Sequence, residues 1–459
     1  MKWISTVLSV LIIISCIVGS AGLPVRAIDN EDVVEGLVDE FCKDTKCSSV
    51  SVAVFDEGEV NCYGDVAGLY QIGSMTKAFT GLAIHKLMSE GKLAPDSTVS
   101  ELINGFTAYY DSKPYEITVE QLLKQTSGYN NSESLYPSAD MDMSLQDWAL
   151  SISGKELQSA PGGKYAYSNV NFNLLGAIIE KVTGQSYKDY MENEILTPLG
   201  LTNTFVSINQ NSKRIISGSR LGYRIIFSYE IPVAEGRIPA GYFYSNAEDM
   251  VRWMQIWLGT ADIPEEYREL VATVKEHLTN EGDYYSGWEV FADGVIGHSG
   301  GTPNYSSRMV FEETSNAGVC VLTNLNVAAS TDSLCNSIFG EVTGGSKAGI
   351  ATDVWTIFDI IFSVVSVTGV ILAASAFRIK KRNVLLILGI AVTVLVIAIC
   401  TVMPLVFGAG LRDIMIVWAP ISFAGGLMLL AADILIIGIR FWVLKERCGS
   451  RKDRLKASL

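Results

Sequence analysis

The stretch Gln71-Ile-Gly-Ser-Met-Thr-Lys-Ala-Phe79 places a serine and a lysine three residues apart, at Ser74 and Lys77, and opens an expected helix that runs to about Glu90. A helix returns position i+3 to nearly the same face, so the lysine amine can lie beside the serine hydroxyl. A desolvated amine, together with a helix N-terminus that favours developing negative charge, activates such a hydroxyl. The alternative interpretation is a helix N-cap followed by a surface lysine, and the rest of the chain must distinguish the two.

Two further polar motifs follow Ser74 in the chain. Tyr167-Ser168-Asn169 ends the Gly-rich loop that begins at Pro161 and leads into an apolar helical run, and His298-Ser-Gly-Gly301 precedes an expected β-hairpin. In this order the three motifs resemble those of the serine β-lactamase and penicillin-binding-protein superfamily, which carries Ser-x-x-Lys, Tyr/Ser-x-Asn and Lys/His-x-Gly elements.

The resemblance covers roughly residues 30 to 340 and is closest to the class C β-lactamase-related branch. It continues through three stretches of the chain: Ile117 to Gly128, Pro239 to Met250, and Tyr285 to Trp288. It implies an α/β (α+β) domain with an antiparallel sheet flanked by helices, plus an all-helical region. His298 stands where β-lactamases themselves usually carry lysine, so we expect a relative of the peptidases and esterases and not an efficient antibiotic hydrolase.

The chemistry and the resemblance together imply roles for the first polar residues. Ser74 is the expected acylated nucleophile, and Lys77 the group that accepts or relays its proton after burial has lowered the lysine pKa. Tyr167 is the alternative base, since a cationic lysine nearby could stabilise a tyrosinate. The sequence leaves these two schemes open.

The remaining motif residues are expected to bind the substrate. Asn169 offers an amide to the lysine and to a substrate carbonyl. His298 is expected on an edge strand facing the nucleophile, where it would contact the leaving group or a substrate carboxylate. Gly300 and Gly301 allow close backbone approach, and the N–H groups of Ser74 and Gly301 would form an oxyanion hole.

Neither a metal nor a cofactor is expected. The other two histidines, His85 and His277, have no Cys, His or carboxylate partner at a metal-ligand spacing, and the chain has no phosphate-binding loop or dinucleotide fingerprint.

Both ends of the chain indicate a membrane. Residues 1–27 resemble a secretory signal peptide, with a lysine at position 2 and an apolar run after it, although an uncleaved anchor or a lipoprotein signal at Cys16 remains an alternative. Three long apolar runs, near 354–377, 384–407 and 414–439, each can span a bilayer. Basic residues lie between the first two runs and in the tail, so the positive-inside rule places the first 350 residues outside and the C-terminus in the cytoplasm.

The charged residues are also distributed unequally between the first 350 residues and the apolar C-terminal part. From Ala351 onward lie 12 of the 35 Lys/Arg residues and 6 of the 49 Asp/Glu residues, so the preceding part carries a net charge of about −20. Such an acidic domain argues against nucleic acid as a partner and agrees with an exported domain.

We therefore expect a signal peptide over 1–27, a hydrolase domain over 28–345, and a membrane domain over 346–459, with the best linker at 342–347. An early strand at Val50 to Val54 should pair with a late hairpin from Arg308 to Leu325. Of the cysteines, Cys42 with Cys47 and Cys320 with Cys335 are conceivable pairs.

The leading functional hypothesis is a membrane-anchored, outward-facing serine hydrolase that cleaves an amide or ester. By resemblance, its substrate is a peptide containing a D-residue, and the signal, domain and three-span arrangement is similar to peptidases that remove N-acyl-D-asparagine from exported prodrugs. A short-chain esterase is a further enzymatic option. The competing class is a non-catalytic or slowly acylating penicillin-binding or sensor protein, whose site holds a ligand without turnover.

Overall fold

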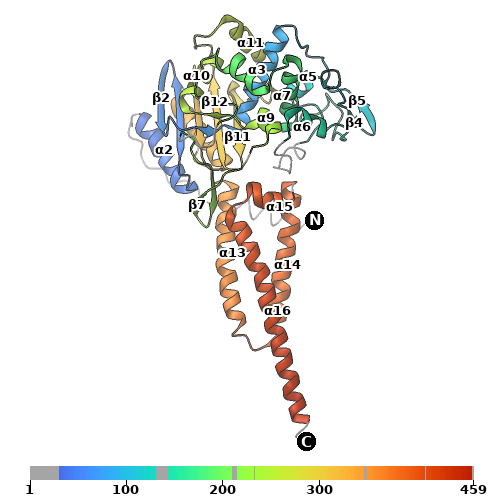
Figure 1. The fold of residues 1–459 in the computed structure, drawn as a ribbon. Helices are drawn as coiled ribbons and strands as arrows, with labels where there is room; N and C mark the ends of the chain where they lie inside the picture. The colour runs from blue at the N-terminus through green and yellow to red at the C-terminus, as the bar shows by residue number, and fades with distance from the viewer. Residues whose placement is uncertain are drawn as a thin grey trace.

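A computed structural model describes residues 30–130, 143–208, 214–231, 233–345, 349–408 and 410–456. The predicted signal peptide over 1–27 lies outside the described residues. A globular part stands on three long helices, and the C-terminus lies at the far end of the longest one (Figure 1).

A seven-stranded antiparallel sheet with the order β2-β1-β13-β12-β11-β10-β9 forms the centre of the globular part. Its strands are β1 (Val50–Asp56), β2 (Glu59–Gly64), β9 (Tyr284–Tyr285), β10 (Trp288–Val290), β11 (Ile296–Thr302), β12 (Tyr305–Glu312) and β13 (Ala317–Thr323). The early strand pairs with the late hairpin as predicted, with Val52 opposite Val321. The α/β (α+β) fold class expected from the sequence is therefore confirmed.

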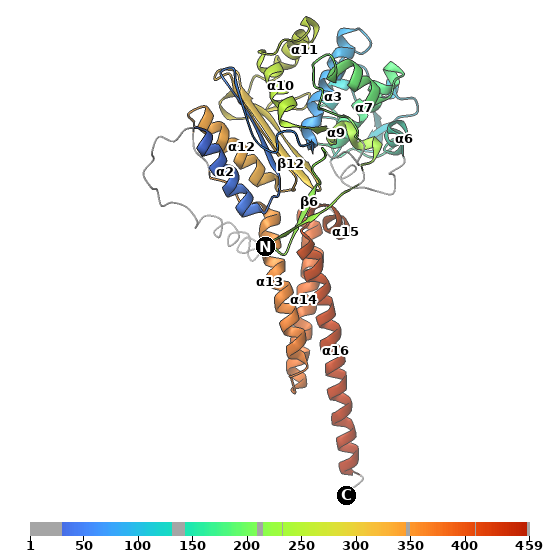
Figure 2. The same ribbon diagram turned by 60° about the vertical axis from the view of Figure 1, so that its left-hand side comes forward.

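Helices cover both faces of this sheet, which makes β1 buried on both sides. The helices α2 (Asn30–Thr45) and α12 (Ala328–Val342) lie on one face, and α10 (Ala247–Leu258) lies on the other (Figure 2). Because side chains alternate along a strand, Val52 and Val54 enter the core under α2 and α12, while Ala53 and Phe55 enter the core on the opposite face. The alternating side chains of β1 thus pack into two hydrophobic cores, one on each face of the sheet.

The all-helical region packs beside the α10 face of the sheet. Its helices are α3 (Thr76–Ser89), α4 (Val99–Leu102), α5 (Val119–Leu123), α6 (Leu145–Ser151), α7 (Asn169–Thr183), α8 (Tyr187–Met191), α9 (Ile238–Gly241) and α11 (Glu265–Lys275). Stacking of Phe79 on Trp253, with ring centroids 4.0 Å apart, joins α3 to α10. Residues of α3 from Thr76 to Leu87 are buried, which fixes the start of this helix against its neighbours.

Short elements complete the globular part. They are β3 (Tyr70–Gln71) with β8 (Tyr244–Ser245), β4 (Ala108–Tyr110) with β5 (Lys113–Tyr115), β6 (Ser219–Gly222) with β7 (Ile225–Ser228), and the turns η1 (Gly73–Met75), η3 (Glu192–Leu196), η4 (Glu235–Arg237) and η5 (Ala292–Gly294).

Three C-terminal helices are long and apolar enough to cross a membrane: α13 (Val354–Ala376), α14 (Arg382–Phe407) and α16 (Ile421–Lys456), the last through its part Ile421–Glu446. The third differs from the predicted span, which began at Ile414. Residues Leu411–Asp413 (α15) and Ile414–Trp418 (η6) form separate short turns, and α16 begins only after Pro420. Proline disfavours a helical conformation at the preceding residue, and Ala419 is accordingly extended, with ψ 148°.

The cysteines at the two conceivable disulfide positions are free thiols. Cys42, Cys47, Cys320 and Cys335 all belong to this group, and the last three of them are buried. The predicted domain boundaries themselves stay predictions.

Candidate active site

Ser74 lies in the 3-10 turn η1, immediately before α3, where the helix N-terminus favours negative charge. The preceding Gly73 has a φ of +53°, and a Cβ at that position would lie 2.4 Å from the backbone nitrogen of Gly301. Only glycine allows this approach of the turn to β11. The sequence around Ser74 thus builds a turn whose backbone lies against Gly300 and Gly301 of the neighbouring strand.

Lys77 is fully buried and reaches three oxygen atoms. Its Nζ lies 2.9 Å from Ser74 Oγ, 2.7 Å from Asn169 Oδ1 and 2.6 Å from the carbonyl oxygen of Ala240. No carboxylate forms an ion pair with Lys77 in the described part of the chain. Burial without a compensating negative charge lowers the pKa of Lys77 well below its ordinary value of 10.5.

Tyr167 is the second group on Ser74. Its hydroxyl shares a hydrogen bond with the Ser74 side chain, and Lys77 Nζ lies 4.9 Å from the centre of its ring. Burial is the largest cause that moves the pKa of Tyr167, and it raises this pKa above the ordinary value of 10. The phenol therefore keeps its proton near neutral pH. Burial thus shifts the two pKa values in opposite directions and favours a neutral Lys77 amine beside a protonated Tyr167 phenol.

Asn169 is the first residue of α7, whose N-cap is Ser168. Gln125, with a positive φ of 57°, holds this helix start in place. Its side-chain oxygen accepts from the backbone N–H of Ser168 at 2.9 Å and from the Asn171 amide, and its carbonyl accepts from the N–H of Ala166. Gln125 lies within the stretch Ile117 to Gly128 that resembles the family, but the sequence predicts no role for it. Gln125 positions the helix through its hydrogen bond with Ser168, which is 43 residues away in the sequence. A local sequence pattern cannot indicate such a contact.

His298 lies on β11, which is not an edge strand as expected. The strand β10 pairs with Ile296 and Gly297, because the chain before the motif folds back as the short β9–β10 hairpin. From His298 onward, the edge of β11 that β10 leaves unpaired faces the turn that carries Ser74. The two backbones are so close that a Cβ on Gly300 would lie 2.1 Å from the carbonyl oxygen of Ile72. Beyond Gly297, this edge of β11 thus has no paired strand among the described residues and lies against the Ser74 turn instead.

The His298 side chain packs between two tyrosine rings. Its ring centre lies 5.9 Å from that of Tyr167 and 5.8 Å from that of Tyr284. Nδ1 lies 2.5 Å from the carbonyl oxygen of Ser299, which can only accept, so Nδ1 carries the proton and Nε2 faces the Tyr284 hydroxyl at 3.4 Å. Burial is the largest cause that lowers the pKa of His298, to about 3. A neutral imidazole thus packs beside the Tyr167 ring. The substrate contact expected for His298 stays a prediction.

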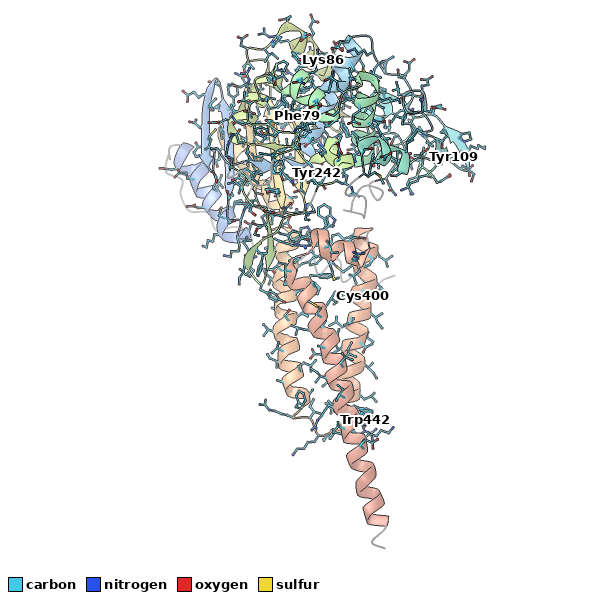
Figure 3. The ribbon with its side chains drawn as sticks, in the orientation of Figure 1. Phe79, Lys86, Tyr109, Tyr242, Cys400 and Trp442 are labelled. Carbon is cyan, nitrogen blue, oxygen red and sulfur yellow. The ribbon has the colours of Figure 1, made fainter. Side chains whose placement is uncertain are left out.

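A pocket opens beside Ser74. The residues that line it include Ser74, Asn169 and Gly301 from the predicted set, but not His298. Other lining residues were not predicted: Asn173, Ile231, Ala234, Arg237, Ala240, Gly241, Tyr242, Pro303, Val417 and Trp418. Arg237 is buried and brings a cation to the pocket. One of the lining residues, Tyr242, lies within the globular part, in the half nearer the long helices (Figure 3).

This arrangement of a serine hydroxyl, a buried amine, a phenol and an amide agrees with a match over residues 34–336 to the family described as Beta-lactamase. The chain belongs to the Beta-lactamase family. Members of this family are generally serine hydrolases that act on amides or esters.

Known proteins with similar sequences place this Beta-lactamase-family chain among several bacterial relatives. Protein flp of Staphylococcus aureus strain MRSA252 is 36% identical over 270 residues, which cover 56% of this chain and 53% of that protein. A protein of Escherichia coli O157:H7, provisionally named a D-alanyl-D-alanine carboxypeptidase, is 37% identical over 145 residues, or 30% of this chain and 33% of that protein. The chain thus spans about half the length of Protein flp.

Solved structures share the fold at lower sequence identity. The octameric penicillin-binding protein homologue from Pyrococcus abyssi matches with a TM-score of 0.60 at 22% identity, over 73% of this chain and 81% of that one. A class C β-lactamase matches with a TM-score of 0.59 at 17% identity, over 71% and 99% of the two chains. These likenesses establish the fold of the Beta-lactamase family for the globular part.

Proposed function

We propose that this chain is a serine hydrolase that forms an acyl-enzyme at Ser74 and cleaves an amide or ester, with a peptide containing a D-residue as the leading substrate class. One observation carries the proposal. The amine of Lys77 is buried, lacks a carboxylate partner among the described residues, and lies 2.9 Å from the Ser74 hydroxyl. An ordinary surface lysine after a helix cap has none of these properties.

The hydrogen bonds around Lys77 orient a neutral amine. Such an amine has two hydrogens and one lone pair, and two carbonyl oxygens, of Asn169 and Ala240, accept the hydrogens at 2.7 and 2.6 Å. The lone pair is left for the third partner, Ser74 Oγ. In the attack, the Ser74 proton moves to Lys77 as Oγ bonds to the substrate carbonyl carbon.

The rest of the reaction uses the neighbours of this pair. The N–H groups of Ser74 and Gly301 are the proposed donors to the oxyanion. The proton held by Lys77 passes to the leaving amine or alcohol, with the Tyr167 hydroxyl as a relay, since it shares a hydrogen bond with Ser74 and retains its proton. Water then attacks the ester at Ser74 and gives a proton to Lys77, which returns this proton to Ser74 Oγ as the bond to the acyl group breaks and the acid is released.

Support for a D-residue in the substrate comes from the relatives and not from the pocket geometry. One relative is provisionally named a D-alanyl-D-alanine carboxypeptidase, and solved structures with this fold include penicillin-binding protein homologues. The sequence arrangement of a globular hydrolase followed by three apolar helices also resembles the N-acyl-D-asparaginyl prodrug peptidases. We propose that the helices anchor the hydrolase outside the cytoplasm, with the basic segment at residues 378–382 and the tail inside.

A substrate panel on the full chain in detergent tests this function. The panel contains a peptide ending in D-Ala-D-Ala, an N-acyl-D-asparaginyl amide, the L-diastereomer of each, and p-nitrophenyl acetate, with Ser74→Ala as the control. We expect hydrolysis that depends on Ser74 and prefers the D-compound of at least one pair by about tenfold or more. Ester cleavage without any preference for the D-compounds would make the protein an esterase. A stable adduct with penicillin without turnover of any substrate would instead indicate a slowly acylating binding or sensor protein.

A further inference from the structure

The wall of the Ser74 pocket includes residues from outside the Beta-lactamase-family match. Val417 and Trp418 line the pocket together with Ser74, although the family match ends at residue 336. Both belong to η6 (Ile414–Trp418), the short turn between the second and third apolar helices. Figures 1 and 2 show this region, next to α15, directly beneath the globular part.

The local sequence directs this turn toward the pocket. Pro420 separates η6 from α16, and the extended Ala419 changes the direction of the chain between them. Ile414 and Val417 are buried, with 0% and 1% of their surface exposed, whereas Ile416 remains exposed at 39%. The turn is therefore packed on one side and is not simply a solvent loop between two helices.

The hairpin β6–β7 binds the backbone of η6. Arg220, on β6, donates from Nη2 to the carbonyl oxygen of Met415 at 2.7 Å, and the hydroxyl of Tyr229 donates to that of Ile416 at 2.7 Å. The Arg220 guanidinium also lies over the Tyr229 ring, 4.6 Å from its centre. Two consecutive carbonyl groups of the turn are thus held by one cation–π pair of the globular part.

A buried carboxylate fixes the tip of the same hairpin to the apolar helices. Asp359 of α13 is fully buried and accepts from the backbone N–H groups of Tyr223 and Arg224, at 2.7 and 2.8 Å. It also accepts from the Ser422 hydroxyl of α16 at 2.7 Å. Buried polar groups are usually hydrogen-bonded in this manner, and the three bonds join two helices to the hairpin.

Both the globular part and the turn between the apolar helices thus contribute residues to the pocket wall. The segment that follows the hairpin contributes Ile231, and the turn between the helices contributes Val417 and Trp418. We propose that Val417 and Trp418 are specificity-determining residues of the hydrolase, so that the substrate pocket is complete only when the apolar helices are present. This inference rests on the proposed acyl-enzyme function and names the part of the chain that selects the substrate.

The wall should select for apolar substituents beside the scissile bond. A tryptophan ring, a valine and an isoleucine offer contact area without a charged group, and removal of a large aromatic wall loses that contact while opening the site to water. Discrimination by apolar contact is commonly about 10- to 200-fold per group. We therefore expect about a tenfold effect from Trp418.

The test uses Trp418→Ala in the full chain in detergent micelles, with p-nitrophenyl acetate and p-nitrophenyl octanoate as substrates. Trp442→Ala is the matched control, because Trp442 lies far along α16 and is 60% exposed (Figure 3). We expect the ratio of kcat/KM for octanoate to that for acetate to fall about tenfold in Trp418→Ala, mainly through KM, and to stay unchanged in the control. End-point labelling of Ser74 by a fluorophosphonate verifies that each variant is folded.

A second variant acts on the position of the wall only. Tyr229→Phe keeps the ring over which Arg220 lies but removes the hydrogen bond to Ile416, and a smaller shift of the ratio in the same direction is expected. A labelled Trp418→Ala protein whose ratio equals that of the control would overturn the specificity proposal and leave the hydrolase intact. Absence of both labelling and ester cleavage in the unmodified chain would overturn the proposed function itself, and the inference with it.

Discussion

Replacing Lys77 by methionine will slow the acylation of Ser74 by about a thousandfold or more. Methionine keeps much of the apolar stem but removes the amine that lies 2.9 Å from Ser74 Oγ. A positioned base contributes about a hundredfold to ten-thousandfold, and a nucleophile and its base act as one unit. The rate of labelling by a fluorophosphonate, measured by stopped samples and gel fluorescence, gives the effect directly. Lys92→Met is the control, since Lys92 is half-exposed and pairs only with Glu90 among the described ion pairs.

The pH dependence separates Lys77 from Tyr167 as the base. Burial lowers the pKa of Lys77, and the amine accepts a proton only after losing its own, so the labelling rate should rise with pH through a midpoint below 10.5 and then level off. Burial raises the pKa of Tyr167, so a tyrosinate base would place the midpoint above 10. Tyr167→Phe should therefore lower the rate but keep the midpoint. A midpoint that disappears in Tyr167→Phe and persists in Lys77→Met would reverse the assignment.

Replacing Gly287 by alanine will cost about 3 kcal/mol or more of folding free energy. Gly287 has a φ of +90°, and a Cβ there would lie 2.3 Å from the backbone nitrogen of Ala78, directly after Lys77. Strain at a positive φ adds to a clash with backbone that a side-chain rotation cannot relieve. The turn between β9 and β10 would have to move away from α3, and Lys77 would move with it. Thermal unfolding of the full chain in detergent measures the loss.

Gly282 provides the matched control for this substitution. Its φ is +89°, but a Cβ at that position meets no atom within 4 Å. Gly282→Ala should therefore lose only about 1 kcal/mol of folding free energy, from the strain of a positive φ without a steric clash. Equal melting temperatures for the two variants would show that the contact between Gly287 and α3 does not limit stability.

The chemistry of the site could be read from short sequence motifs because the residues of each motif are neighbours in the chain. Ser74 and Lys77 share one turn, and the Tyr167–Asn169 element forms the start of one helix. The order of these motifs also identified the fold. A local pattern does not contain partners from distant segments of the chain, such as the carbonyl oxygen of Ala240 that Lys77 contacts, or the side chain of Gln125 that accepts from the Ser168 backbone.

In the apolar C-terminal part, too, hydropathy did not indicate where one segment ends or which distant residues it contacts. Hydropathy alone identified three runs, and it merged Ile414 to Trp418 with the third because these residues are as apolar as a span. Pro420 was the available signal for a break, since the residue before proline leaves the helical conformation. That the turn ends beside Ser74 depends on the hairpin contacts of Arg220 and Tyr229, which link positions nearly 200 residues apart.

In the proposed function, Ser74 becomes covalently acylated. The intact mass of the full chain tests this step, measured over time after mixing with p-nitrophenyl acetate or penicillin and compared with that of Ser74→Ala. We expect an added mass of one acyl group on the unmodified chain, mapped by peptide analysis to Ser74 and lost again on hydrolysis, and no such mass on Ser74→Ala. Equal added mass on both proteins, or none on a folded unmodified chain, would contradict it.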